Sequence, residues 1–160
     1  MSGCLLNSNA VISTPIGSLK IVEHDGAVIE IRETSRALEP PSTLLLQKAC
    51  SEIEAYFDGR LKEFTFSVRL TGTDFRIAVW TACRNIPFGT TASYSQIAGA
   101  IGSPGSQRAV GTALGLNPLL LVVPCHRVVS KTSLGGFRLP LPTKKFLLNL
   151  EFNAKLPDSL

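Results

Sequence analysis

The sequence predicts an α+β protein of two domains, a small α+β domain over residues 1–70 and a mainly α domain with a helix-turn-helix over residues 71–160. Three observations predict this division. The first third of the chain holds short β-type runs separated by turn signals, followed by one helical pattern. The second half holds several short helical patterns in succession. The charge also changes: residues 1–70 carry seven basic and nine acidic side chains, whereas residues 71–160 carry nine basic and three acidic ones.

Within the first domain, a β-hairpin is expected near the start of the chain. Residues 11–14 and 19–22 are apolar and β-branched, which predicts two strands. Asp25-Gly26 is a hairpin turn signal, because a type I′ turn needs positive φ at both of its central residues. Residues 28–31 then form the expected return strand.

A helix and a further strand are expected to complete this domain. Residues 43–58 place apolar side chains at helical spacing, and Gly59 follows where a helix ends. Residues 61–70 alternate between apolar and polar side chains, which predicts a half-buried strand.

Four helices are expected in the second domain, and the last of them opens at Pro142 and carries Glu151. Residues 73–86 begin with a capping threonine and carry an apolar stripe. Ser93 and Gln96 form a capping box, which opens a short helix that Gly102 ends. Residues 103–116 form the next helix, with proline at its first position. Two short helices joined by a tight turn indicate a helix-turn-helix, and an ordinary helical hairpin in a core is the alternative.

Composition limits the classes to which the protein can belong. With 44% hydrophobic and 18% charged residues among 160, the chain has a globular composition and can bury a core. No apolar run reaches the roughly 18 to 20 residues that a membrane span needs, and the start lacks the basic region of a secretory signal. We therefore expect no membrane association and an intracellular protein, located in the nucleus of a eukaryote or the cytoplasm of a prokaryote.

The cysteines and histidines give little support to a metal site. The four cysteines are widely spaced and form no CxxC pair, which argues against a zinc ribbon or a disulfide framework. The two histidines, His24 and His126, lie far apart among these cysteines, so we expect no metal. Cys4 and His24 could be two ligands, but no convincing second pair is present.

The adjacent residues Cys125 and His126 are the first candidate for chemistry. The apolar residues 119–123 end at Pro124, so we expect a buried strand that delivers Cys125 at its end. A thiol beside an imidazole is the usual pair for making a thiolate at neutral pH. Adjacent residues point apart in a strand, so the two side chains need a sharp turn or a bridging water to communicate. A buried cysteine beside a structural histidine is the simpler alternative.

Arg108 is the second candidate. It is the one charged residue between positions 103 and 116. A helix that grips phosphates usually carries several cations, whereas small neighbours let a backbone approach another molecule closely. The basic second half suggests a polyanionic partner, with nucleic acid first. A solvated surface arginine is the alternative interpretation.

These motifs, taken with their spacing, resemble the O6-alkylguanine-DNA alkyltransferases, also called methylated-DNA–protein-cysteine methyltransferases. The resemblance covers about half of the chain and ends near Glu151, and residues 14–19 match the family's opening strand. It rests on the segments Gly72-Thr73-Asp74-Phe75, Val79-Trp80, Ile86-Pro87, Ser93-Tyr94, Arg108-Ala109-Val110-Gly111, Asn117-Pro118 and Pro124-Cys125-His126-Arg127-Val128.

The resemblance implies a ribonuclease-H-like amino-terminal domain and a winged-helix-like DNA-binding domain. It implies DNA repair by direct, single-turnover transfer of an alkyl group from O6 of guanine, and from O4 of thymine, to Cys125. The damaged base is turned out of the duplex from the minor groove. The implied partner is double-stranded DNA that contains O6-alkylguanine, no cofactor is needed, and the protein is a monomer in the absence of DNA.

The family's residue roles carry over to the matching positions. Cys125 is the implied alkyl acceptor, His126 holds the water that activates it, and Glu151 orients His126. Tyr94 assists the base flip and hydrogen-bonds the base, and Asn117 braces the active-site turn. The implied substrate- and DNA-binding residues are Arg108, which fills the gap left in the duplex, and Tyr94, Ser93, Gly111, Val128, Lys144 and Arg127.

The segment after the reactive turn departs from the family pattern. Gly135-Gly136-Phe137 lies one residue early, and Leu139-Pro140 stands where the family carries a Gly-Gly pair. Pro140 and Pro142 stiffen a loop that borders the alkyl pocket, so we expect them to affect the range of alkyl groups that the protein accepts. Three other functions compete: a lesion-binding relative without alkyl transfer, a cysteine hydrolase, and a helix-turn-helix regulator.

Overall fold

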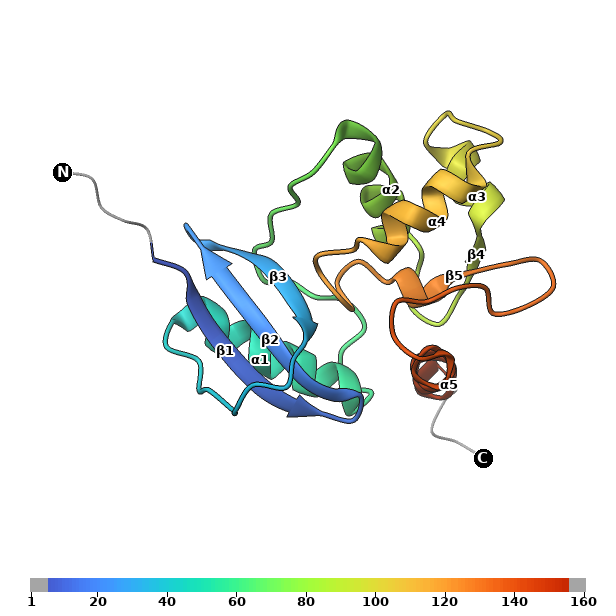
Figure 1. Ribbon diagram of the computed structural model, residues 1–160. Helices are drawn as coiled ribbons and strands as arrows, with labels where there is room; N and C mark the ends of the chain where they lie inside the picture. Colours follow the sequence, from blue (N-terminus) through green and yellow to red (C-terminus); the bar gives the residue numbers. More distant parts are fainter. Residues whose placement is uncertain (1–5, 156–160) are drawn as a thin grey trace. The chain divides into compact units, whose positions relative to one another are not determined.

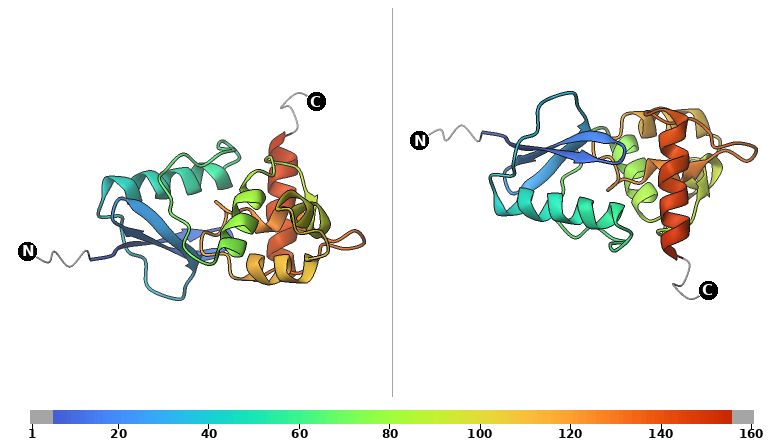
Figure 2. Two further views of the ribbon diagram at one scale, coloured as in Figure 1. Left: turned by 90° about the horizontal axis from the view of Figure 1, so that it is seen from above. Right: turned by 90° about the horizontal axis from the view of Figure 1, so that it is seen from below.

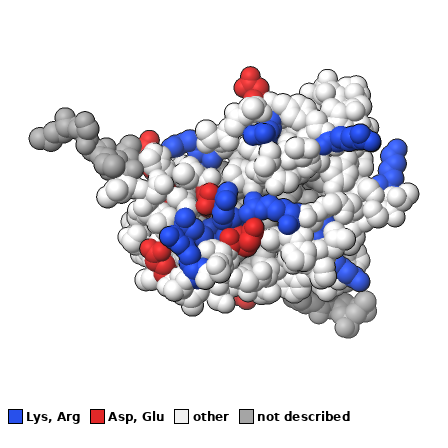
Figure 3. Space-filling model, in the orientation of Figure 1, with Lys and Arg blue, Asp and Glu red and all other residues white. Residues whose placement is uncertain are grey.

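The chain divides into two compact units, Met1–Thr71 and Gly72–Leu160. A computed structural model describes residues 6–155 (Figure 1). No helix within these residues is long and apolar enough to cross a membrane. On the face drawn in Figure 3, basic and acidic side chains lie intermixed, so the net charge of +4 is not gathered there into one large patch.

The first unit is a three-stranded antiparallel sheet with one helix. Its strands are β1 (Ser8–Thr14), β2 (Gly17–His24) and β3 (Ala27–Glu33), in the order β1-β2-β3. The hairpin prediction is confirmed: Asp25 and Gly26 have φ of 48° and 73°, as a type I′ turn requires.

Helix α1 (Leu44–Phe57) covers one face of this sheet and contacts all three strands (Figure 2). The predicted helix is confirmed, with Thr43 as its N-cap and Gly59 at φ 73° just beyond its end. Its buried stripe packs against the apolar face of the sheet, which forms the core of this unit.

The strand predicted over residues 61–70 is wrong. Only one isolated bridge forms there, between Val28 and Val68. The alternation still predicts burial in part, because Phe66 is buried and its ring packs edge-on against Phe64. A single bridge orders the segment without a ladder of hydrogen bonds, so alternation alone did not specify a strand.

The second unit is mainly helical. Its elements are α2 (Asp74–Arg84), β4 (Ala92–Ser93), α3 (Tyr94–Ala100), α4 (Gln107–Gly115), a 3₁₀ turn η1 (Cys125–Arg127), β5 (Val128–Val129) and α5 (Leu141–Lys155). Strands β4 and β5 pair in parallel, which joins the start of α3 to the residues after η1. Helices α3 and α4 pack on each other and on α2.

Two helix starts in this unit follow their predicted caps. The Thr73 hydroxyl accepts a hydrogen bond from the backbone N–H of Arg76 at 3.3 Å. The capping box of α3 is complete: Ser93 accepts from the Gln96 N–H at 3.1 Å, and the Gln96 side chain accepts from the Ser93 N–H at 2.7 Å. These bonds satisfy donors that a helix start leaves unpaired.

The predicted start of α4 is wrong by several residues. The helix begins at Gln107, not at Ser103-Pro104. Gly105 has φ of 89°, a conformation that cannot belong to a right-handed helix. Pro104 therefore lies in the turn between α3 and α4.

The strand predicted over residues 119–123 is also wrong. These residues fold into a buried tight turn, in which the Val123 N–H donates to the Leu119 carbonyl at 2.9 Å. Leu121 takes a φ of 73°, which is uncommon for a leucine. A fully apolar run indicates burial but does not distinguish a strand from a buried turn.

Candidate active site

Cys125 is held at the start of the η1 turn by its own backbone and by Asn117. The Cys125 N–H donates to the Val123 carbonyl at 2.7 Å. The Asn117 side-chain amide donates to Cys125 Sγ at 3.3 Å and to the Val123 carbonyl at 2.8 Å, and its oxygen accepts from the Leu119 N–H at 2.9 Å. Asn117 is buried, so these bonds fix the turn and the thiol together.

His126, the residue after Cys125 in sequence, forms a buried pair with Glu151. His126 Nε2 lies 2.6 Å from Glu151 Oε1, and both side chains are buried. A carboxylate only accepts hydrogen bonds, so Nε2 carries the proton and Nδ1 carries a lone pair. Nδ1 is also buried. The pairing therefore produces an imidazole that is ready to accept a proton at Nδ1.

Arg127 completes this network from the other side of the carboxylate. Its guanidinium donates to both Glu151 oxygens at 2.9 Å and to the Ile86 carbonyl at 2.7 Å. The Gly89 N–H adds a longer bond to Glu151 at 3.2 Å. The Arg127 guanidinium and the Glu151 carboxylate compensate each other inside the fold, and their hydrogen bonds offset the free-energy cost of burying both charges.

The pKa directions in this network follow from burial and hydrogen bonding. Burial lowers the pKa of His126, and the hydrogen bond to Glu151 only partly offsets this, so the imidazole is neutral at pH 7. Burial alone raises the pKa of Glu151, but hydrogen bonds from His126 and Arg127 outweigh it and lower the pKa to about 2. Burial raises the pKa of Cys125, and the Asn117 bond and the Lys144 charge offset this only in part. The resting group is therefore a thiol that needs a base.

Helix α5 positions two of the predicted residues on one face. Lys144, Leu147 and Glu151 follow one another at i, i+3 and i+7 and are all buried. The Lys144 ammonium donates to the Val128 carbonyl at 2.7 Å and to the Gly136 carbonyl at 2.9 Å. It also lies 5.8 Å from the centre of the Phe137 ring.

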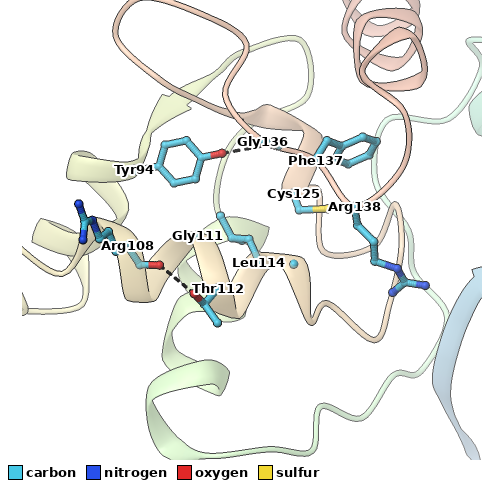
Figure 4. Close-up of a pocket in the computed structure, with 10 residues that line it drawn as sticks. Tyr94, Arg108, Gly111, Thr112, Leu114, Cys125, Gly136, Phe137 and Arg138 are labelled. Atoms are coloured by element: carbon cyan, nitrogen blue, oxygen red, sulfur yellow. Dashed lines mark hydrogen bonds between the residues drawn. The ribbon is translucent and has the colours of Figure 1, made fainter.

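A pocket of about 600 Å³ reaches the thiol. Its lining residues are Tyr94, Arg108, Gly111, Thr112, Leu114, Gly115, Cys125, Gly136, Phe137 and Arg138. Figure 4 shows Cys125 between α4 and the loop that carries Gly136, with the Arg108 side chain projecting away from the thiol at the other end. The Tyr94 hydroxyl donates to the Gly136 carbonyl at 3.3 Å. The pocket thus joins a nucleophile to an exposed cation on α4.

Close packing of glycines fixes the Tyr94 ring. A Cβ on Gly135 would lie 2.8 Å from the Tyr94 hydroxyl oxygen, and Gly135 has φ of 74°. A Cβ on Gly111 would stand 3.7 Å from the other edge of the ring, which is ordinary contact. Gly135 is therefore required by both its conformation and its neighbour.

The structure separates the predicted site residues into two groups. Cys125, Tyr94, Arg108 and Gly111 line the pocket, and the residues behind the thiol are Asn117, His126 and Glu151. Ser93 caps α3 and pairs with Val129. The Val128 carbonyl accepts from Lys144, and its N–H donates to the Cys125 carbonyl.

Two residues expected at the DNA have other surroundings. Arg127 is buried, and its guanidinium is engaged with Glu151 and Ile86, so the expectation that it contacts DNA is corrected: it positions the carboxylate. Lys144 is fully buried behind the pocket wall, whereas the adjacent Lys145 is exposed. Sequence alone could not distinguish these two lysines.

The sequence missed part of the pocket. Arg138 lines it and donates from Nη1 to the Asn117 carbonyl at 3.1 Å. Thr112 and Gly115 also line it, and both follow from helical spacing, because they lie four and seven residues after Arg108. Arg138 carries no comparable signal, because it lies in an irregular loop.

His24 and Cys4 are the two residues that the sequence offered as conceivable metal ligands. His24 Nδ1 lies 2.8 Å from the Asn7 side-chain oxygen, and Cys4 lies outside the described residues. Within residues 6–155, no three His, Cys, Asp or Glu side chains come together in a way that could hold a metal ion.

The chain matches known proteins over nearly its whole length. The profile of the family described as "6-O-methylguanine DNA methyltransferase, DNA binding domain" matches residues 74–153. The chain is 40% identical over 156 residues to the methylated-DNA–protein-cysteine methyltransferase of Mycobacterium tuberculosis (strain H37Rv), covering 93% of this chain and 94% of the relative. It is 41% identical over 150 residues to the inducible methylated-DNA–protein-cysteine methyltransferase of Bacillus subtilis, covering 90% and 84%.

Solved structures agree with this match. The crystal structure of Mycobacterium tuberculosis O6-methylguanine methyltransferase superposes with a TM-score of 0.86 at 36% identity, covering 96% of this chain and 97% of that one. Mycobacterium tuberculosis OGT in complex with DNA superposes with a TM-score of 0.84 at 38% identity, covering 91% and 93%. The identity, the coverage and the motifs around Cys125 together place this chain in the family of methylated-DNA–protein-cysteine methyltransferases.

Proposed function

We propose that this protein repairs DNA by transferring an alkyl group from O6 of guanine, and from O4 of thymine, to Cys125. One observation carries the proposal: the Cys125 thiol lines a pocket while the buried His126–Glu151 pair supplies a neutral base beside it. A DNA-binding role for the carboxy-terminal unit is supported by the family match over residues 74–153.

The reaction balances with these groups alone. The thiol proton passes through a bridging water to His126 Nδ1, and Glu151 stabilises the imidazolium that forms. The Sγ–carbon bond forms as the carbon–O6 bond breaks, and the electron pair of that bond stays on the base. The base takes up the proton and remains in the DNA as unmodified guanine. Because a water carries the proton, the side chains of the adjacent residues Cys125 and His126 need not touch.

Each molecule acts once in this proposal. The product is a thioether, whose sulfur is a poor leaving group. A second turnover would need another nucleophile to remove the alkyl group, and among the described residues Cys125 is the one cysteine that lines the pocket. The protein is therefore consumed in proportion to the lesions that it repairs.

DNA binding is assigned to the helix pair α3 and α4. We place α4 in the minor groove, where Arg108 fills the gap left by the flipped nucleotide and Tyr94 assists the flip and contacts the base. Turning a mispaired alkylguanine out of the duplex costs less unstacking and unpairing free energy than turning out a correctly paired base. The small residues Gly111 and Gly115 allow α4 to approach the DNA closely.

The two units carry different roles in this proposal. The second unit is a winged-helix-like domain that binds double-stranded DNA containing O6-alkylguanine, and the first is a ribonuclease-H-like domain. The free protein is a monomer. A solved relative in complex with DNA supports the DNA-binding role.

The decisive test uses a duplex oligonucleotide that contains one O6-methylguanine. After mixing, the intact mass of the protein should increase by one methylene, and peptide mapping should locate it on Cys125. Cys125→Ala should gain no mass, and Cys50→Ala, a matched change at another buried cysteine, should react like the native chain. Tight binding with an unmodified Cys125 would support the lesion-binding alternative instead.

A further inference from the structure

Arg138 is a pocket residue for which the reaction as described has no role. It lines the same pocket as Cys125 and is only partly exposed. Its Nη1 donates to the Asn117 backbone carbonyl at 3.1 Å. A guanidinium carries several N–H donors in one plane. The bond to Asn117 therefore holds the group in place and can coexist with a bond to a ligand.

The lining of this pocket is positively charged. Among the described residues that line it, Arg108 and Arg138 are basic and none is acidic. The buried Glu151 carboxylate is engaged by His126 and by the Arg127 guanidinium, so its charge is already compensated. The pocket therefore favours a ligand that brings negative charge.

The two cations lie at different ends of the pocket. Figure 4 shows Arg138 beside Cys125, on the side away from Tyr94 and Arg108. In the proposed function Arg108 enters the duplex and the flipped base contacts Tyr94. Arg138 is then the cation on the far side of the thiol, where the phosphates of the duplex do not account for it.

Asn117 connects the Arg138 guanidinium to the thiol. Its side-chain amide donates to Cys125 Sγ at 3.3 Å, and its backbone carbonyl accepts from Arg138. Burial raises the pKa of Cys125, and the Arg138 charge is among the influences that partly offset this. One buried residue thus holds both groups, and the charge of Arg138 acts at the sulfur that receives the alkyl group.

The geometry of displacement determines where the rest of an alkyl group lies. Sγ and the leaving O6 take opposite sides of the reacting carbon, so further atoms on that carbon project sideways, toward the walls beside the thiol. One of these walls is formed by Gly136, Phe137 and Arg138. A methyl group has no such atoms, which is why methyl transfer gives Arg138 nothing to contact.

We infer that Arg138 is a specificity-determining residue that favours alkyl groups bearing a carboxylate on the reacting carbon, of which carboxymethyl is the smallest. The inference deepens the proposed alkyl transfer and rests on it. The bonds are those of methyl transfer: the Sγ–carbon bond forms, the carbon–O6 bond breaks, and its electron pair stays on the base. The carboxylate keeps its charge and pairs with the guanidinium. Without this partner it would be repelled by a sulfur that is becoming anionic.

The test places a charged or a neutral group on Cys125 without DNA. Iodoacetate delivers carboxymethyl, and iodoacetamide delivers carbamoylmethyl, which is neutral and nearly the same size. With either reagent the Sγ–carbon bond forms, the carbon–iodine bond breaks and iodide leaves. Peptide mapping by mass spectrometry gives both rates at Cys125, and their ratio removes any general change in thiol reactivity. In Arg138→Gln the ratio of the iodoacetate rate to the iodoacetamide rate should fall by about fivefold.

Two further variants serve as controls. Arg138→Lys keeps the charge and should keep most of the native ratio. Lys131→Gln removes an exposed cation from the same loop and should keep the native ratio, because solvent and salt screen that charge. A folded Arg138→Gln with the native ratio overturns the inference. An equal fall in Lys131→Gln also overturns it, because the preference would then belong to the net charge.

Duplexes that contain O6-carboxymethylguanine or O6-carbamoylmethylguanine extend the test to the proposed substrate. Each transfer rate is divided by the rate of the same protein on O6-methylguanine. In Arg138→Gln the carboxymethyl value should fall and the carbamoylmethyl value should not, and an unchanged carboxymethyl value overturns the inference. If the native chain accepts no alkyl group from any duplex, the alkyl-transfer proposal fails. The reagent ratio still decides whether Arg138 recognises the charge.

A measurement on the native chain covers the case in which Arg138→Gln does not fold. Cys125 is alkylated with either reagent, and the ¹⁵Nε signal of Arg138 is compared between the two products, which differ by one negative charge. The signal should differ between the products, and the difference should shrink as salt is added. Identical Arg138 signals in both products overturn the inference.

Discussion

At the scale of single residues, Glu151 connects more of the site than any motif suggested. One carboxylate accepts hydrogen bonds from His126, from Arg127 twice and from the Gly89 backbone. It therefore sets the tautomer of the base and neutralises a buried guanidinium. The resemblance implied only that Glu151 orients His126, and the link to Arg127 depends on a contact between residues 24 positions apart.

Glu151→Gln tests both tasks. The amide keeps the shape but leaves Arg127 without a counter-charge and orients His126 less firmly. We expect methyl transfer to slow by about a hundredfold or more and the free energy of unfolding to fall by about 3 kcal/mol. Single-turnover rates and urea unfolding measure the two effects. Glu54→Gln, at an exposed site on α1, is the control, and native behaviour in both variants would contradict this assignment.

Arg108→Ala tests the wedge role. The arginine is exposed at the outer end of the pocket and is far from the proton path. The variant should repair duplex DNA at least about tenfold more slowly, whereas its reaction with free O6-benzylguanine should keep nearly the native rate. Arg84→Ala, another exposed arginine of this unit, should affect neither rate. Equal losses on both substrates would exclude the wedge.

At the scale of elements, the sequence predicted helix starts correctly where a single capping residue determines the backbone conformation. Thr73 and Ser93 start helices because their side chains satisfy free N–H groups. Residues 61–70 and 119–123 were predicted as strands and are not. A strand needs a partner that pairs along its length, and that partner is chosen by the tertiary structure.

The loop that borders the pocket offers a test at this scale. In Gly135→Ala the new Cβ would meet the Tyr94 hydroxyl at 2.8 Å, in a backbone with φ of 74°. We expect a loss of about 1 to 3 kcal/mol in unfolding free energy and slower methyl transfer, because Tyr94 must move. Gly102 has a similar φ and open space around it. Gly102→Ala therefore measures the free-energy cost of placing a side chain at positive φ without any clash. Equal rates in the two variants would show that Tyr94 does not depend on the loop.

At the scale of the whole molecule, acid should destabilise the carboxy-terminal unit. His126 has a folded pKa below its usual value of 6.5 and Glu151 has one of about 2 instead of 4.5. As pH falls below 6.5, the unfolded chain binds a proton that the folded His126 resists. Between 4.5 and 2 the same holds for Glu151. Both groups therefore contribute stability at neutral pH that is lost on acidification.

The single tryptophan makes this measurable. Trp80 is buried in the second unit, where its indole N–H donates to the Ala113 carbonyl at 2.8 Å. Urea midpoints followed by Trp80 fluorescence should fall as the pH is lowered from 7 to 4. Glu151→Gln should lose the part of this dependence below pH 4.5. A native midpoint that does not change with pH would contradict the assigned protonation states.

The sequence by itself determined the hairpin, the capped helices, the family and the identity of the reactive pair Cys125–His126. These depend on turn chemistry, on helix caps and on spacing, which are local properties. Only the tertiary structure decided which cations are buried: Arg127 and Lys144 read as candidate DNA contacts and lie inside the fold instead. Burial depends on which distant segments supply partners, here the Glu151 carboxylate and the Val128 and Gly136 carbonyls. The packing of α5 against the η1 turn is decided at this scale too, because it brings the Glu151 carboxylate to His126 and the Lys144 ammonium to the Val128 carbonyl.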